Sequence, residues 1–272
     1  STLPAYRRKR ELSLNRRTSK MPGLSRTLRA EWLRLKRTFT PSFVLTLPAS
    51  LTCIALILRY LTPNAHVWNY YVWSLLNWWP LLWLPFGIAL LAAHTMMLEK
   101  RAGAWKALRA RAIEPSQLYL AKLLMLTVHT LVSSLLLIVL SLVFGIVLLK
   151  GPVPWQAISS TVLGTWIAAL PLVALMLWAG FIGGYGLTLG LTLIGFLAGT
   201  IAAIKDVWFL VPWALPLRAA IPLAGLNPNG VPLQPGDPAW HTPLLPIMLV
   251  ALVGYLLFAL LGTCWFVRRE VK

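Results

Sequence analysis

The sequence lacks the short motifs by which most enzymes bind phosphate, activate a nucleophile or hold a catalytic metal. It contains no GxxxxGK[ST] loop, no HExxH, no GxSxG and no pair of carboxylates placed for general acid and base work. Its two cysteines, Cys53 and Cys264, each lie inside an apolar run without a CxxC partner, so neither a disulfide framework nor a zinc site is indicated. We therefore expect a chain that is not an enzyme and that carries no metal and no cofactor of its own.

Acidic residues are scarce as well, and their positions argue against a second class of function. Only 7 residues are Asp or Glu, against 25 Lys and Arg, and all the acidic ones lie outside the long apolar runs. Transporters driven by an ion gradient usually keep an acidic residue inside the membrane. The ionisable residues expected there are His94 and His129, and a lone histidine in a bundle is more often a hydrogen-bonded packing residue than a proton relay. Coupling to an ion gradient is therefore not expected.

Apolar residues, in contrast, are abundant. They make up 58% of the 272 residues, charged residues make up 12%, and the mean hydropathy is +0.72, which is typical of a bilayer protein. The net charge of +18 does not indicate a nucleic-acid partner, because the basic residues lie at the ends of apolar runs and form no water-soluble basic face. Membrane lipids are the expected surroundings.

The apolar runs and the basic residues together predict the topology. Five segments free of Asp, Glu, Lys and Arg are long enough to cross a bilayer, namely 38–58, 60–98, 123–149, 151–204 and 238–267. The fourth has 54 residues, enough for two crossings, and the glycine cluster from Gly180 to Gly186 at its centre indicates a tight turn. Of the 25 basic residues, 21 lie in 1–42, 100–122 and the C-terminal tail, which assigns these segments to the cytoplasm. An even number of crossings follows, so we expect an all-α membrane protein of six transmembrane helices with both termini inside.

Two further segments are predicted before this transmembrane domain, which covers 41–272. Residues 1–23 are polar and rich in arginine, so a disordered basic N-terminal extension is expected. Residues 24–40 are expected to form an amphipathic helix on the inner leaflet, because apolar and basic side chains alternate with helical spacing. Its apolar face carries Leu24, Leu28, Trp32, Leu35 and Phe39.

The segment 207–240 is apolar enough to suggest a seventh span, but its composition argues against one. It contains Pro212, Pro216, Pro222 and the internal Arg218. Prolines inside a helix remove backbone hydrogen bonds, and an unpaired charge in lipid is costly. We expect an external or shallowly re-entrant element between helices five and six.

The cytoplasmic loop 98–117 carries a pattern that resembles a known family. Glu99, Gly103, Trp105 and Lys106 are followed by Pro115 and Lys122. This is similar to the signature after the second span of ABC-2-type transporter permeases, particularly the branch of lantibiotic-immunity and bacitracin-resistance permeases. The segment Arg29-Ala-Glu31-Trp-Leu-Arg-Leu-Lys36 also resembles the N-terminal segment of that family.

The resemblance implies a permease of the bacterial cell membrane that works with a cytoplasmic ABC ATPase and with a second permease, identical or related. ATP and Mg would bind the ATPase, and the cargo would be hydrophobic or amphipathic, such as an antimicrobial peptide or a drug, exported for immunity or resistance. The coupling helix that contacts the ATPase would contain Glu99, Gly103, Trp105, Lys106, Leu108 and Arg109. Gly183, Gly184 and Tyr185 would form a second cytoplasmic contact, and Leu28, Glu31, Trp32, Leu35 and Phe39 would belong to the interfacial helix.

Two other functions remain open at this point. A haem, cytochrome-assembly or lipid-exporting permease would have a similar topology, although only His66 and His241 are candidate external haem ligands. A membrane anchor that transports nothing would lack the ATPase contact.

Overall fold

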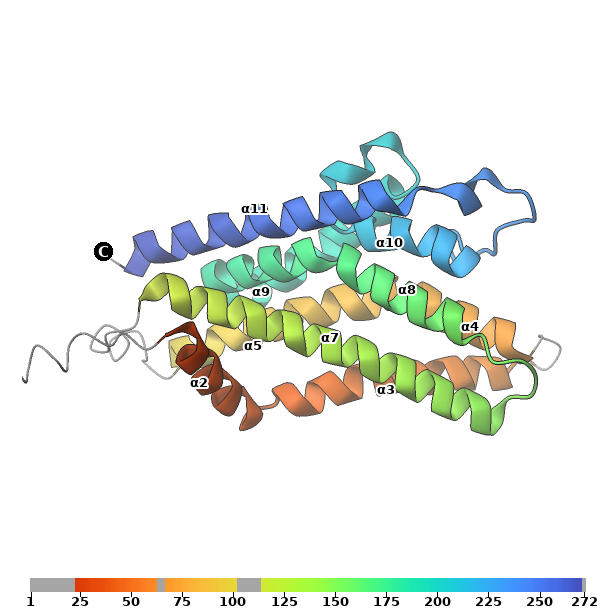
Figure 1. Cartoon of the computed structure of the whole chain (residues 1–272), viewed down its shortest axis with the longest axis horizontal. Coiled ribbons are helices and arrows are strands. Elements are labelled where there is room, and N and C mark those ends of the chain that lie inside the picture. The colour runs from red at the N-terminus through yellow and green to blue at the C-terminus, as the bar shows by residue number, and fades with distance from the viewer. Residues whose placement is uncertain (1–22, 63–66, 102–113, 271–272) are drawn as a thin grey trace, which may run out of the picture.

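The structure, a computed structural model, describes residues 23–62, 67–101 and 114–270, and this part of the chain is a bundle of long helices without a β-sheet (Figure 1). The elements in chain order are α2 (Leu24–Lys36), α3 (Thr40–Tyr60), α4 (Val67–Trp78), η1 (Trp79–Trp83), α5 (Leu84–Arg101), α7 (Pro115–Leu148), α8 (Trp155–Ala168), α9 (Leu170–Ala202), η2 (Asp206–Leu210), α10 (Ala214–Ala220), η3 (Ile221–Gly225), η4 (Pro238–His241) and α11 (Leu244–Glu270).

Five helices of the described part are long and apolar enough to cross a membrane. They are Thr40–Tyr60, Trp68–Leu98, Pro115–Leu148, Leu170–Ala202 and Leu244–Arg268. The prediction of an all-α membrane fold is therefore confirmed. The second of these helices joins α4 and α5 through the π-helical turn η1, whose second residue is Pro80. Proline lacks an N–H donor, so a local change in helical hydrogen bonding at this position is expected.

The fourth long helix, α9, reverses its direction. Gly184 has φ 59° and ψ −143°, a backbone conformation that residues with a Cβ rarely adopt. The Thr192 hydroxyl lies 3.5 Å from the Met176 sulfur, although 16 positions separate them in the chain, and a straight helix would hold them about 24 Å apart. The helix is therefore two antiparallel arms joined at Gly184, where the glycine cluster predicted a turn.

The 34-residue helix α7 holds neighbouring helices through polar contacts. The Tyr71 hydroxyl of α4 donates to the Ser141 carbonyl at 3.1 Å, and Trp166 Nε1 of α8 donates to the Thr130 hydroxyl at 3.2 Å. The hydroxyls of Thr127 and Tyr255 lie 3.1 Å apart and join α7 to α11. Lipid offers no hydrogen-bond partners and no hydrophobic drive between helices, so such contacts help to fix helix order in a bilayer.

The segment between α9 and α11 is inserted into the bundle. Ala214 and Ala219 of α10 are fully buried, and the Trp213 side chain lies directly against Gly195 and Gly199 of α9. The apolar helical stretch Ala214–Gly225 is too short for a transmembrane span, because its length of about 18 Å is well below the ~30 Å of bilayer hydrocarbon.

The two ends of the described chain lie at the same end of the bundle. In Figure 1 the start of α2 and the end of α11 both lie on the left. Helix α2 stops at Lys36, four residues before the predicted boundary at 40, and α3 starts at Thr40. The short connection at Arg37–Phe39 sets α2 at an angle across α7, as Figure 1 shows.

Candidate functional site

Helix α2 packs on α7 through a face that overlaps the predicted apolar face only in part. Among its described side chains Thr27, Glu31 and Leu35, spaced four residues apart, are buried, and this spacing places them on one side of a helix. Trp32 and Phe39, which were assigned to the apolar face, remain 46% and 60% exposed. Helix α2 therefore docks through its buried face, and these two aromatic side chains lie at the border of the contact, partly exposed as expected for an interfacial helix.

The centre of the buried face is an ion pair. Lys122 Nζ donates to Glu31 Oε2 at 2.9 Å, and the side chains are 0% and 7% exposed. The other carboxylate oxygen of Glu31 lies 3.6 Å from Arg34 Nη1, whose side chain is partly exposed. Buried charges are tolerated when they are paired and hydrogen-bonded, so this pair fixes the position of α2 along α7.

Lys122 was counted among the basic residues of the segment 100–122, which was expected in the cytoplasm. The residue lies in the third turn of α7, which already begins at Pro115, and it is completely buried. Glu31 was expected in the interfacial helix, and its side chain is buried by the same contact.

Aromatic contacts extend the docking of α2 on both sides of the ion pair. The rings of Trp32 and His129 stack at 5.7 Å between centroids, and His129 Nδ1 lies 2.6 Å from the Met125 carbonyl. Phe39, at the C-terminal side of α2, meets His94 of α5 edge to face at 6.2 Å. Both histidines are thus packing residues at the contact between α2 and the bundle.

The turn of α9 belongs to the same group of contacts. Tyr185 follows Gly184, and its hydroxyl lies 3.0 Å from His94 Nδ1. Gly184 itself is buried against the Met97 sulfur of α5, whereas Gly183 is exposed. His94 therefore connects the α9 turn with Phe39 beside α2, and three separate chain segments meet at one end of the bundle.

The predicted coupling helix lies almost entirely outside the described residues. Gly103, Trp105, Lys106, Leu108 and Arg109 fall in the segment 102–113. Glu99 lies in the last turn of α5, which ends at Arg101, and its side chain is likewise outside the described part. Helix α5 thus directs the chain toward this segment from the end of the bundle where α2 and the Gly184 turn lie. No group of three or more His, Cys, Asp or Glu side chains that could hold a metal ion occurs among the described residues.

A comparison with protein families identifies the class to which these contacts belong. The family model described as "ABC-2 family transporter protein" matches residues 27–199, which is more than half of the chain. The chain belongs to the ABC-2 family. Its role is accordingly that of a multi-pass membrane permease subunit of an ABC transporter, and the matched range includes the Glu31–Lys122 pair and the Gly184 turn. Searches of curated proteins and of solved structures gave no significant match.

Sequence reasoning missed the pairing of Glu31 with Lys122 because 91 positions separate the two residues. Each of the two residues nevertheless has a sequence feature that weakly indicates a buried partner. Glu31 is the only acidic residue in a helix that is otherwise basic, and Lys122 follows Pro115, a favoured first residue of a helix, by seven positions. A helix that begins at Pro115 carries Lys122 two turns inward, where a charge requires a partner.

Proposed function

We propose that this ABC-2 permease exports a hydrophobic or amphipathic molecule, crosses the membrane six times and keeps both termini in the cytoplasm. The reversal of α9 at Gly184 supports an additional crossing within the fourth long helix. The start of α2 and the end of α11 lie at one end of the bundle (Figure 1), which an even number of crossings requires. The positive-inside rule supports a cytoplasmic location for that end.

The observation that carries the proposal is the contact between three segments at this end. His94 of α5 touches both Phe39, beside α2, and Tyr185 at the α9 turn. We expect a displacement of this part of α5 to reach both other elements, because side chains in contact can transmit strain. This is the arrangement expected where an ATPase would drive the bundle between two packed states.

In this proposal the segment 98–117 is the main ATPase contact and Gly183–Tyr185 is the smaller one. The ATPase is a separate chain that binds ATP and Mg, and a second permease, identical or related, completes the membrane part. Antimicrobial peptides and lipid-like drugs are the proposed cargo, since the spans contain few charged side chains that would favour a strongly polar solute.

The ATPase contact is tested by reconstituting the permease with its ATPase partner in lipid nanodiscs. We expect Trp105→Glu or Gly103→Asp to abolish the ATP hydrolysis that the permease stimulates, while membrane insertion stays normal. Trp155→Glu serves as the matched control, because Trp155 is an exposed tryptophan at the opposite end of the bundle. Unchanged stimulation in the Trp105 variant would overturn the assignment of the coupling segment.

The export direction and the cargo need a separate experiment. Inverted membrane vesicles that contain the permease and the ATPase should accumulate a fluorescent cationic amphipathic peptide when ATP is added. Accumulation should be absent without ATP and in the Trp105→Glu variant. If ATP is hydrolysed but no peptide is taken up, this cargo is excluded, and the proposed ATPase contact is unaffected.

A further inference from the structure

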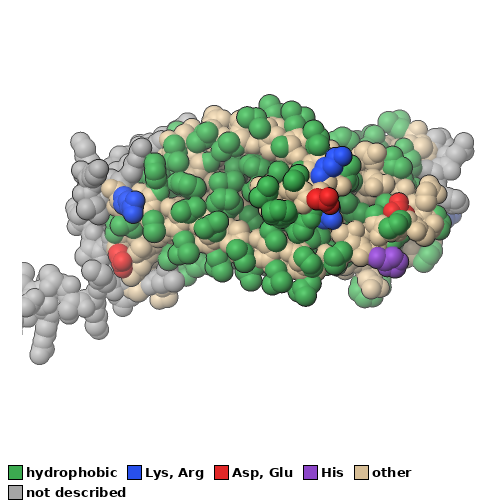
Figure 2. All heavy atoms as spheres, turned by 90° about the horizontal axis from the view of Figure 1, so that it is seen from above, with side chains coloured by type: hydrophobic (Ala, Val, Ile, Leu, Met, Phe, Trp, Pro, Cys, Tyr) green, Lys and Arg blue, Asp and Glu red, His purple; other side chains and the backbone are tan. Residues whose placement is uncertain are grey.

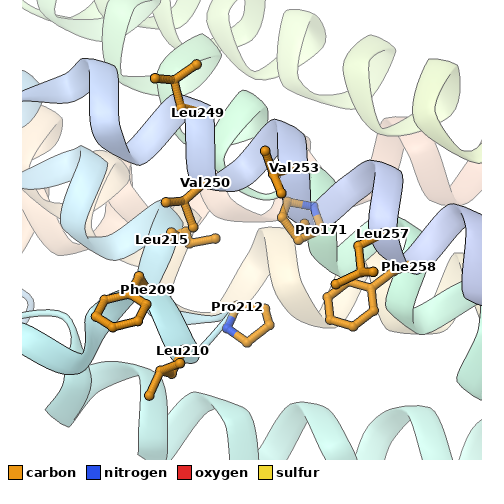
Figure 3. Close-up of a pocket in the computed structure, with 11 residues that line it drawn as sticks. Pro171, Phe209, Leu210, Pro212, Leu215, Leu249, Val250, Val253, Leu257 and Phe258 are labelled. Carbon is orange, nitrogen blue, oxygen red and sulfur yellow. The ribbon is translucent and has the colours of Figure 1, made fainter.

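An apolar crevice opens between α11 and the segment that contains η2. Its volume is about 360 Å³, and all its lining residues are apolar or glycine. Figure 3 shows Leu249, Val253 and Leu257 along one side of α11, with Phe209 and Leu210 across the opening. The volume lies at the lower end of the range of small-molecule sites, and the lining suits a hydrocarbon chain.

The crevice exists because two structural features hold its walls. Gly254 lets α11 approach Pro171 of α9, since a Cβ at Gly254 would lie only 3.2 Å from the proline ring. On the other wall, Arg218 Nη1 donates to the Ala203 carbonyl at 2.7 Å, and its guanidinium lies 5.1 Å from the centre of the Trp208 ring. Arg218 thus contacts Ala203 and Trp208, which lie on either side of Asp206 in the chain. Its positive charge is therefore already engaged by contacts within the protein.

Charged side chains lie at the start of the segment that forms one wall of the crevice. Lys205 directly precedes η2 and Asp206 is its first residue; both are exposed, and η2 contributes Phe209 and Leu210 to the lining. Figure 2 shows such a small group of basic and acidic side chains within a face that is otherwise largely hydrophobic. No salt bridge joins Lys205 to any residue in the described part of the chain.

The depth of Lys205 in the bundle matches an interface between lipid and water. The second arm of α9 runs from Tyr185 to Ala202 and is roughly 27 Å long, close to the ~30 Å of bilayer hydrocarbon. Lys205 follows this arm, so it lies near the membrane surface opposite the Gly184 turn. Pro171, which lines the crevice, precedes Gly184 by 13 positions on the first arm of α9 and lies about 20 Å from the turn, so this part of the crevice is nearer the bilayer centre than Lys205.

We propose that this crevice binds one acyl chain of a glycerophospholipid from the leaflet opposite the Gly184 turn, with Lys205 holding the lipid phosphate. The Lys205 ammonium at the surface is complementary to the lipid phosphate, and the apolar crevice is complementary to the acyl chain. The proposal concerns lipid binding alone and does not depend on the cargo or on the ATPase.

The test uses the full chain in detergent, titrated with phosphatidylglycerol, and native mass spectrometry to measure the first bound lipid. Val253→Trp fills the crevice and should weaken this binding at least tenfold, because excluding about two methylene groups already has that effect. Lys205→Gln should weaken it about fivefold, as expected for the loss of a partly exposed ion pair. Leu257→Trp replaces Val253→Trp if the latter fails to elute as a folded protein.

The matched controls are Leu256→Trp and Lys150→Gln. Leu256 is an exposed residue of α11 outside the crevice lining, and Lys150 is another exposed single cation. The proposal would be overturned if Leu256→Trp weakened lipid binding as much as Val253→Trp does. It would also be overturned if Lys150→Gln weakened binding as much as Lys205→Gln does. Disulfide formation between two copies carrying Val253→Cys in native membranes would also overturn it, since a second copy would then cover the crevice.

Discussion

The paired charges of Glu31 and Lys122 depend on each other. Removing one partner of a buried pair costs about 3–5 kcal/mol, whereas replacing both with apolar groups of similar size is often neutral. We expect Glu31→Leu to lower the free energy of unfolding strongly, and Lys122→Met to lower it less, since Arg34 remains 3.6 Å from Glu31. The double variant should recover most of the loss, as measured by unfolding in sodium dodecyl sulfate.

An exposed carboxylate provides the comparison for this pair. Glu114 immediately precedes α7 and is exposed, so Glu114→Gln should change stability by less than about 0.5 kcal/mol. A double variant as unstable as Glu31→Leu would show that the charges themselves, and not their pairing, hold α2 in place.

Gly184 allows a second prediction at the scale of one residue. Its φ of 59° and a distance of 3.0 Å from an added Cβ to the Met97 sulfur both disfavour a side chain. Gly184→Ala should therefore destabilise the protein by about 1–3 kcal/mol, measured by thermal unfolding in detergent. Gly186→Ala should be nearly neutral, because no heavy atom lies within 4 Å of the added Cβ. Equal effects at the two positions would contradict the turn geometry.

At the scale of elements, Gly195 and Gly199 of α9 leave the space into which Trp213, just before α10, is inserted. The Trp213 ring occupies the space that a side chain at Gly195 would need. We expect Gly195→Leu to displace Trp213 and to expose α10 to limited proteolysis, with little loss of the long helices. Gly190→Leu on the same arm should leave the digestion pattern unchanged, because the space around Gly190 is open.

The elements also show which features a single sequence reveals. The helix spans, the turn at Gly184 and the failure of 207–240 to form a long helix follow from local composition, since glycine and proline act on their own backbone. The buried face of α2 does not, because Thr27 and Glu31 are polar, and the partner of Glu31 is a lysine 91 positions away on another helix. The link from Phe39 through His94 to Tyr185 was missed for the same reason.

For the molecule as a whole, the proposed topology can be measured directly. Single cysteines at Gly186 and Asn229, in a chain with Cys53 and Cys264 replaced by serine, should face opposite sides of the membrane. An impermeant maleimide added to intact cells should label Asn229→Cys only, and inverted vesicles should give the opposite result. Labelling of both positions from one side would exclude the six-helix arrangement.

The ion pair between α2 and α7 also constrains how the chain is made. Helix α2 leaves the ribosome 91 residues before Lys122, which corresponds to roughly 5–18 s at ordinary rates of synthesis. During that time Glu31 has no Lys122 to pair with, and α2 lacks this docking contact. Docking of α2 through the pair therefore requires the first turns of α7 to have been made, so a chain cut short before Lys122 would carry α2 without its buried partner.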